Sequence, residues 1–150
     1  MKGPADVTGQ ELFQSLSVDG VQKINEISEV RTYKAGETIF NPDEKAKNVF
    51  LLLDGLVALR FPGKEEAFSA GLVRIEKNDL IGAGALLGSP RYVSQAYCVK
   101  NSTVLTIDGK KLREILEEDR IVGFDVVMKI ANHYFERYIN IMKKVQSIFG

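Results

Sequence analysis

The chain of 150 residues has the length of one ordinary domain, and its 45% hydrophobic and 27% charged residues are typical of a globular protein. Its 20 basic and 20 acidic residues give a formal net charge of zero, which argues against a dedicated nucleic-acid binder. A single cysteine, Cys98, excludes an internal disulfide. No apolar run approaches the roughly 20 residues that span a bilayer, so we expect a cytoplasmic protein with no membrane partner.

The first predicted elements are helices between residues 10 and 30. Apolar residues recur there at helical spacing, which indicates one buried face. They are Leu12, Phe13, Leu16, Val21, Ile24 and Ile27. Gly20 indicates a turn, so we expect two short helices in this region. The residues before it, MKGPADVTGQ, lack the apolar run of a signal peptide.

The pattern of apolar residues changes between residues 31 and 108, where short apolar or alternating runs are separated by Gly, Pro, Asn and Asp. The runs lie at residues 37–40, 49–53, 56–61, 70–75, 96–99 and 103–107. Many short strands at such spacing are typical of a sandwich, a jelly roll or a barrel. The fold class predicted for the whole chain is therefore mainly β with helices at both ends.

A helical pattern returns between residues 109 and 148. Asp108 is placed to cap a first helix, and a second, longer helix is expected from residue 122. Apolar residues in the long helix are spaced alternately by four and three positions, which is the pattern of a coiled-coil seam. The predicted seam consists of Val127, Ala131, Tyr134, Tyr138, Ile141, Val145 and Ile148. Because Phe135, Ile139 and Met142 offer a second apolar face for the roll, we expect the seam to pair two copies in a homodimer.

No catalytic constellation is visible in the sequence. The only histidine, His133, lies in the long helix, whereas a metal enzyme built on a β-barrel needs several His and carboxylate ligands. Neither a Gly-x-Ser-x-Gly elbow nor a phosphate loop ending in Gly-Lys-Ser/Thr is present. We therefore expect no enzyme and no metal site, and an enzyme of the cupin type is disfavoured.

The Gly-rich stretch from Ile81 to Arg91 is the one candidate binding segment. Such a loop opening a short helix can point backbone N–H groups at an anion, and Arg91 can add a charge-assisted contact. By itself the stretch is equally compatible with a tight turn and a surface arginine. The predicted ligand-binding residues are Gly82, Ala83, Gly84, Ala85, Arg91, Tyr92 and Val93.

The order of these parts resembles the cyclic nucleotide-binding domain of catabolite-activator/FNR-type regulators, kinase regulatory subunits and gated channels. The resemblance covers nearly the whole chain, and no single piece of it is decisive. Its pieces are Glu11–Leu16, Tyr33–Phe40, Val49–Gly55, Asn78–Gly82 and Ser102–Asp108. It implies a β-roll of the jelly-roll or double-stranded β-helix type, an α+β fold that is mainly β, with N-terminal helices and a long C-terminal dimerisation helix. It also implies a regulatory role in signal transduction and a cyclic nucleotide, cAMP or cGMP, as the ligand.

The phosphate-binding cassette of that family is altered in this chain. The family has a Glu that binds the ribose hydroxyl, and here that position is Ala83. The family also has an Arg that binds the cyclic phosphate, and two alignments place it differently. A gapped alignment puts Arg91 there, whereas an ungapped one puts Tyr92 there and leaves Arg91 beside it. A turn glycine expected after Phe40 is Asp43.

Two functional hypotheses follow. The first is a non-enzymatic dimeric module with a degenerate cassette, which has lost the pocket, binds cyclic nucleotides weakly or takes another effector such as a small anion. The second is a genuine cAMP or cGMP sensor of a transcription regulator or signalling protein. Regulators of this family usually continue into a helix-turn-helix. The 150 residues of the sequence hold no such element after the long helix, so we expect no direct DNA binding by this chain.

Overall fold

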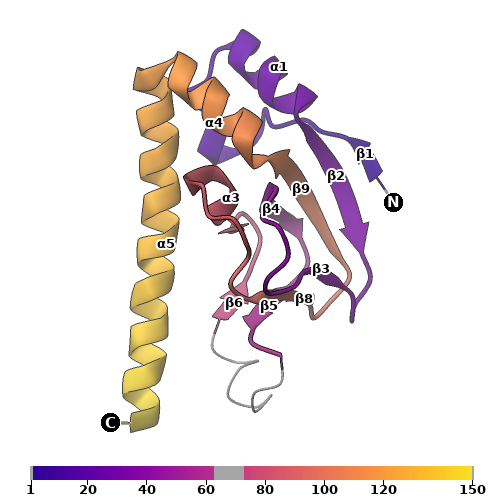
Figure 1. Ribbon diagram of the computed structural model, residues 1–150, viewed down its shortest axis with the longest axis vertical. Helices are drawn as coiled ribbons and strands as arrows, with labels where there is room; N and C mark the ends of the chain where they lie inside the picture. The colour runs from indigo at the N-terminus through magenta and orange to yellow at the C-terminus, as the bar shows by residue number, and fades with distance from the viewer. Residues whose placement is uncertain (1, 63–72, 150) are drawn as a thin grey trace.

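A computed structural model describes residues 2–62 and 73–149. It confirms the predicted fold class, a mainly β roll with helices before and after it (Figure 1). The described elements are β1 (Lys2–Pro4), the 3-10 helix η1 (Glu11–Phe13), α1 (Val18–Glu26), β2 (Ser28–Tyr33), β3 (Thr38–Phe40), β4 (Asn48–Asp54), β5 (Val57–Arg60), β6 (Val73–Ile75), β7 (Leu80–Ile81), α3 (Gly84–Leu87), β8 (Gln95–Cys98), β9 (Ser102–Asp108), α4 (Gly109–Glu118) and α5 (Arg120–Phe149). Residues 70–72 of one predicted strand lie outside the described residues.

Two antiparallel sheets form the roll. The larger has the strand order β1-β2-β9-β4-β7, and the smaller has the order β3-β8-β5-β6. The last strand, β9, lies between β2 and β4 and pairs with both of them. The final strand of the roll is therefore central in the larger sheet, where it joins segments from the beginning of the chain.

Strand β4 separates two hydrophobic cores. Val49 and Leu51 belong to the core between the larger sheet and the helices. Phe50 and Leu52 belong to the core inside the roll, between the two sheets. Because both faces of this strand are buried, its sequence is a continuous apolar run rather than an alternating one.

The N-terminal segment departs from the predicted helical region of residues 10–30. Helix α1 ends at Glu26, and β2 begins at Ser28, before the predicted start of the roll at residue 31. Residues 28–30 follow the predicted helical spacing of the apolar residues, but they form a strand because β2 pairs with β9, from Ser28 opposite Ile107. Upstream, β1 extends the sheet along β2, and Val7 is fully buried in the core beneath the helices.

The C-terminal helices pack closely on the roll and on each other. Asp108 accepts a hydrogen bond of 2.9 Å from the Lys111 N–H, which confirms the predicted cap of α4. A Cβ atom at Gly109 would lie 2.6 Å from a carbonyl oxygen of α3, and one at Gly123 would lie 2.1 Å from the Leu116 carbonyl oxygen. Backbone therefore meets backbone between α3 and α4 and between α4 and α5. Among the described helices, none is long and apolar enough to cross a membrane.

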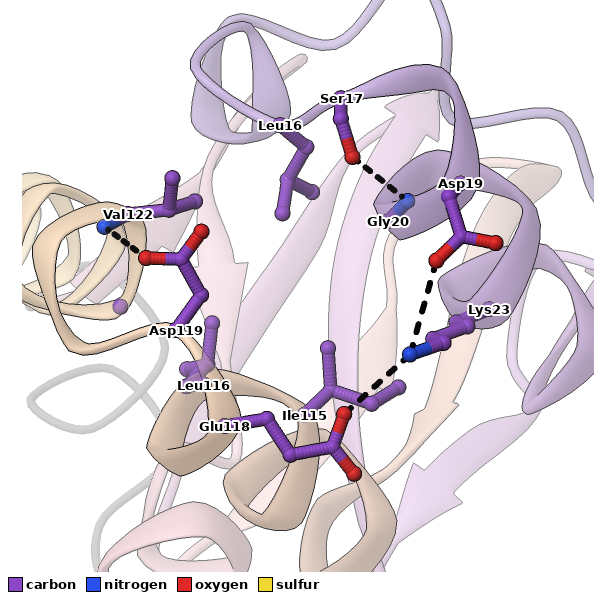
Figure 2. Close-up of a pocket in the computed structure, with 11 residues that line it drawn as sticks. Leu16, Ser17, Asp19, Gly20, Lys23, Ile115, Leu116, Glu118, Asp119 and Val122 are labelled. Atoms are coloured by element: carbon purple, nitrogen blue, oxygen red, sulfur yellow. Dashed lines mark hydrogen bonds and ion pairs between the residues drawn. The ribbon is translucent and has the colours of Figure 1, made fainter.

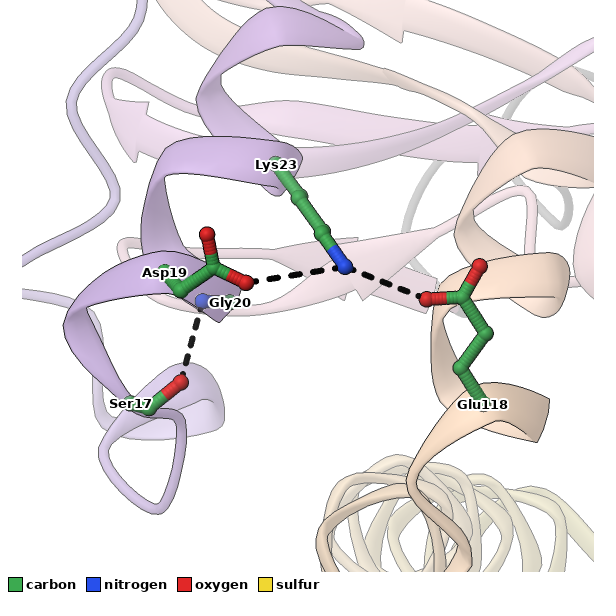
Figure 3. A network of polar contacts seen from close by, with 5 residues as sticks. All are labelled: Ser17, Asp19, Gly20, Lys23 and Glu118. Atoms are coloured by element: carbon green, nitrogen blue, oxygen red, sulfur yellow. Dashed lines mark hydrogen bonds and ion pairs between the residues drawn. The ribbon is translucent and has the colours of Figure 1, made fainter.

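Helix α1 is joined to the end of α4 by an exposed polar cluster around a cavity of about 210 Å³ (Figure 2). The Lys23 Nζ lies 3.2 Å from a Glu118 carboxylate oxygen and 3.5 Å from one of Asp19 (Figure 3). The hydrogen bond to Glu118 raises the pKa of Lys23. Because these side chains are largely exposed, the ion pairs orient α1 but add little to the free energy of unfolding.

Candidate functional site

The predicted binding residues lie in the segment of residues 82–93, which follows β7 and includes α3. Gly82 has a φ of +75°, and a Cβ atom there would lie 3.1 Å from the Asn48 carbonyl oxygen. Gly88, at a φ of +90°, ends α3 in the left-handed region. Both positions favour glycine, because other residues seldom adopt a positive φ. These glycines allow the segment to turn tightly against β4.

Arg91 points away from the interior of the roll. Its side chain is exposed, and its guanidinium donates a hydrogen bond of 2.7 Å to the Asp43 carbonyl oxygen. Asp43 has a φ of +68°, so it holds the left-handed turn for which the resemblance implies a glycine. The loop around Asp43 is also bonded to this segment, because the Asp43 N–H donates to the Tyr92 carbonyl oxygen and the Tyr92 N–H donates to that of Glu44, both at 3.0 Å.

Tyr92 points into the roll. Its ring stacks on Phe40 with centroids 4.0 Å apart, and only 8% of the residue is exposed. Its hydroxyl donates to the Asn48 carbonyl oxygen at 2.7 Å and accepts from the Asn48 N–H at 3.0 Å. Burial raises the pKa of Tyr92, so the phenol is neutral at physiological pH. The side chain fills part of the space between the sheets and satisfies two backbone groups of β4.

A small cavity of about 150 Å³ lies beside this segment. It is lined by Phe40, Leu59, Gly82, Ala83, Gly84, Ser89, Arg91, Tyr92, Val93, Ser94, Tyr134 and Arg137. Six of the seven predicted binding residues thus border one cavity, whereas Ala85 does not and lies against Gly109 of α4. Among the described residues, the charged groups of the lining are two arginines, with no carboxylate.

Helix α5 supplies two cavity residues whose role the sequence analysis missed. The Ala83 N–H donates a hydrogen bond of 3.1 Å to the Tyr134 hydroxyl, and the Arg137 guanidinium donates one to the Leu80 carbonyl oxygen. The Arg137 guanidinium carbon also lies 4.5 Å from the centroid of the Tyr134 ring. Tyr134 is therefore in contact with its own roll, whereas the sequence analysis placed it in the seam between two copies. The signal was available, because Val126, Ile130, Tyr134 and Arg137 follow one another at helical spacing.

The exposed face of α5 carries an apolar row that shares only Ala131 and Tyr138 with the predicted seam. Val127, Ala131, Tyr138 and Ile148 of that seam are exposed, but Ile141 and Val145 are half-buried, and Ile141 borders a groove between α5 and β6. We define the outer stripe as the exposed apolar residues that are spaced alternately by four and three positions. It consists of Phe124, Met128, Ala131, Phe135, Tyr138 and Met142. The second apolar face suggested by Phe135 and Met142 thus points outward.

The described residues hold no group of three or more His, Cys, Asp or Glu side chains that could bind a metal ion. His133 lies on α5 with its Nδ1 3.9 Å from a carboxylate oxygen of Asp79. Cys98 is fully buried inside the roll, where desolvation raises its pKa. Burial of this kind is typical of an inert core thiol rather than a nucleophile.

Comparisons with known proteins agree with this architecture. Residues 30–119 match the family model of the cyclic nucleotide-binding domain. A cyclic nucleotide-binding domain from Methylobacillus flagellatus KT is similar in structure, with a TM-score of 0.77 and 13% sequence identity over 97% of this chain and 86% of that chain. A protein from Geobacter metallireducens GS-15, described as a candidate cyclic nucleotide-binding protein, has a TM-score of 0.74 and 27% identity over 90% and 97% of the two chains. The sensor domain of the transcriptional regulator DNR from Pseudomonas aeruginosa has a TM-score of 0.70 and 18% identity over 87% and 85%.

Proposed function

Because this chain belongs to the cyclic nucleotide-binding domain family, as the resemblance in its sequence implies, we propose that it is a non-enzymatic regulatory module with an altered pocket. In this proposal it binds cyclic nucleotides weakly and responds instead to another small anion. The observation that carries the proposal is the arrangement of Tyr92 inside the roll with Arg91 turned outward to Asp43. This arrangement supports the ungapped alignment, in which a tyrosine stands where the family has its phosphate-binding arginine.

The lining and size of the cavity support the same proposal. The resemblance implies a glutamate for the ribose hydroxyl, but no carboxylate is found in the described lining, and Ala83 is 3% exposed with its N–H bonded to Tyr134. The volume of about 150 Å³ is also below the roughly 300–1,000 Å³ of pockets for drug-sized ligands. A cyclic nucleotide would therefore have to displace side chains to enter.

Titration calorimetry with cAMP and cGMP tests this proposal. Loss of one charge-assisted hydrogen bond corresponds to an affinity roughly 10- to 150-fold lower, so we expect weak or undetectable binding by the unchanged protein. Ala83→Glu alone is expected to restore little, whereas Ala83→Glu combined with Arg91→Pro and Tyr92→Arg is expected to strengthen binding. Circular dichroism confirms that each variant folds. Low-micromolar binding of either nucleotide by the unchanged protein would favour the genuine sensor and reject the altered pocket.

We propose further that the module is a homodimer formed through the outer stripe of α5. The stripe extends over much of the helix, and its residues are exposed on the side away from the roll. Phe124 and Phe135 are 68% and 60% exposed, which is unusual for large apolar side chains that lack a partner. Alternating spacing of four and three residues is the pattern by which a helix packs along a second, similar helix, so the proposed occupant is a second copy of this chain.

A further inference from the structure

The side chain of Arg137 is a half-buried cation without a counterion in the described structure. It lies on α5 and borders both the cavity and the groove between α5 and β6. Glu76, Asp79 and Glu136 also line that groove, but none of the described carboxylates forms a salt bridge with Arg137. Its described contacts are the hydrogen bond to the Leu80 carbonyl oxygen and the face of the Tyr134 ring. A partly desolvated charge with only neutral partners is unfavourable compared with the same charge beside an anion.

The guanidinium has unused hydrogen-bonding capacity. It carries five N–H donors in a planar fork, which matches the paired oxygens of a carboxylate or phosphate. The hydrogen bond to Leu80 uses one side of that fork. Ser89 and Ser94, also on the cavity wall, can supply hydroxyl groups to the same ligand.

Arg91, the other cation of the lining, is less suited to this role. It is exposed, and its NH1 group already donates to the Asp43 carbonyl oxygen in a loop fastened by several backbone hydrogen bonds. Arg137 lies on α5, which runs alongside α3 and the roll (Figure 1). The two arginines thus approach the cavity from different elements, and only Arg137 links it to α5.

We propose that Arg137 is the anion-binding residue of this cavity, and that the ligand is a small molecule carrying one phosphate or carboxylate group. The inference rests on the proposed function, because it requires that the cavity take an anion other than a cyclic nucleotide. The long helix, rather than the segment of residues 82–93, then supplies the charge that holds the ligand. The anion binds the side of the Arg137 fork that Leu80 leaves free, so occupancy adds a contact that holds α5 against the cavity.

Titrations of inorganic phosphate and of sodium acetate, followed by the backbone amide NMR signals of residues 82–84, test the inference. We expect saturable shifts with at least one of the two anions, and which one saturates decides between a phosphate and a carboxylate ligand. Arg137→Gln is expected to weaken that binding about tenfold or more, as loss of a charge-assisted contact does. Arg120→Gln, which removes the same charge from the exposed start of α5, is the matched control. Thermal unfolding shows whether each variant retains the fold.

Three results would overturn the inference. They are the lack of saturation with either anion, undiminished binding by Arg137→Gln, and a loss in Arg91→Gln as large as that in Arg137→Gln. Failure of the proposed function is a separate observation, because it appears as low-micromolar cAMP or cGMP binding by the unchanged protein. The two failures are therefore measured with different ligands and cannot be confused.

Discussion

Phe135→Glu is expected to separate the dimer while leaving the fold of each protomer intact. An aromatic side chain buries roughly 200 Å² when fully covered, and Phe135 is 60% exposed, so a partner could cover about 120 Å² of it. At about 25 cal/mol per Å², this area contributes about 3 kcal/mol per protomer. Because both protomers carry the substitution, the dimer loses about 6 kcal/mol, which corresponds to a factor of roughly 20,000 in the dissociation constant before any cost of burying the new carboxylates.

Sedimentation velocity across a dilution series measures this change directly. We expect the unchanged protein to sediment as a dimer and Phe135→Glu to sediment as a monomer. In solutions dilute enough for the unchanged protein to dissociate, the two proteins should have the same melting temperature. Val18→Glu is the matched control, because Val18 is 87% exposed but lies on α1, outside the stripe. Ile141→Lys tests the seam predicted from sequence, and we expect it to destabilise the packing of α5 near β6 instead. A monomeric unchanged protein, or a Phe135→Glu variant that still dimerises, would refute this reasoning.

Three further substitutions test the packing around the site by urea and thermal unfolding. Tyr92→Phe keeps the stacked ring but leaves two backbone groups of Asn48 without their partner, so we expect a loss of about 1–3 kcal/mol. Burial raises the pKa of Tyr92 above its ordinary value of 10.0, so above pH 10.0 the unfolded chain loses the phenol proton more readily than the folded chain does. The free energy of unfolding of the unchanged protein should therefore fall as the pH rises through this range. Tyr92→Phe has no phenol proton to lose and should lack this pH-dependent loss of stability. Gly123→Ala places a Cβ atom 2.1 Å from a carbonyl of α4 and is expected to cost about 1–3 kcal/mol, whereas Gly9→Ala, with nothing within 4 Å, should cost nothing measurable. Asp108→Ala removes the cap of α4 and should cost about 1 kcal/mol, most of which Asp108→Asn should restore.

The strands of the roll could be predicted where the sequence has a continuous apolar run, as a strand buried on both faces does, or where turn residues bound the strand. The apolar run in β4 and the Asp108 cap of α4 are examples. Strand β1 and the burial of Val7 could not be predicted, because they depend on an edge that β2 offers only after it has paired with β9. Segments with so few apolar residues carry no periodic signal of their own.

The site was harder to predict than the fold, because two of its lining residues, Tyr134 and Arg137, come from α5. This helix has apolar residues around much of its circumference, and several rows of them satisfy a spacing of four and three. Spacing alone therefore could not say which row meets the roll. Gly123 and the buried Val126 and Ile130 settle the orientation, and that orientation brings Tyr134 and Arg137 to the cavity.

One helix thus carries both proposed interfaces, the cavity on the face that packs on the roll and the outer stripe on an exposed face. A ligand can shift the dimer equilibrium only by its difference in affinity for two positions of α5. The contacts of Tyr134 and Arg137 with the backbone at Ala83 and Leu80 hold α5 in one such position, and an anion on the free side of the Arg137 fork would favour that position further. The close approach at Gly123 restricts how α5 can respond, because its first turns lie against the backbone of α4. Movement would therefore be concentrated beyond that contact, in the part of α5 that carries Phe135 and Tyr138. If anion binding changes the dimer association constant by some factor, linkage requires that dimerisation change the anion affinity by the same factor.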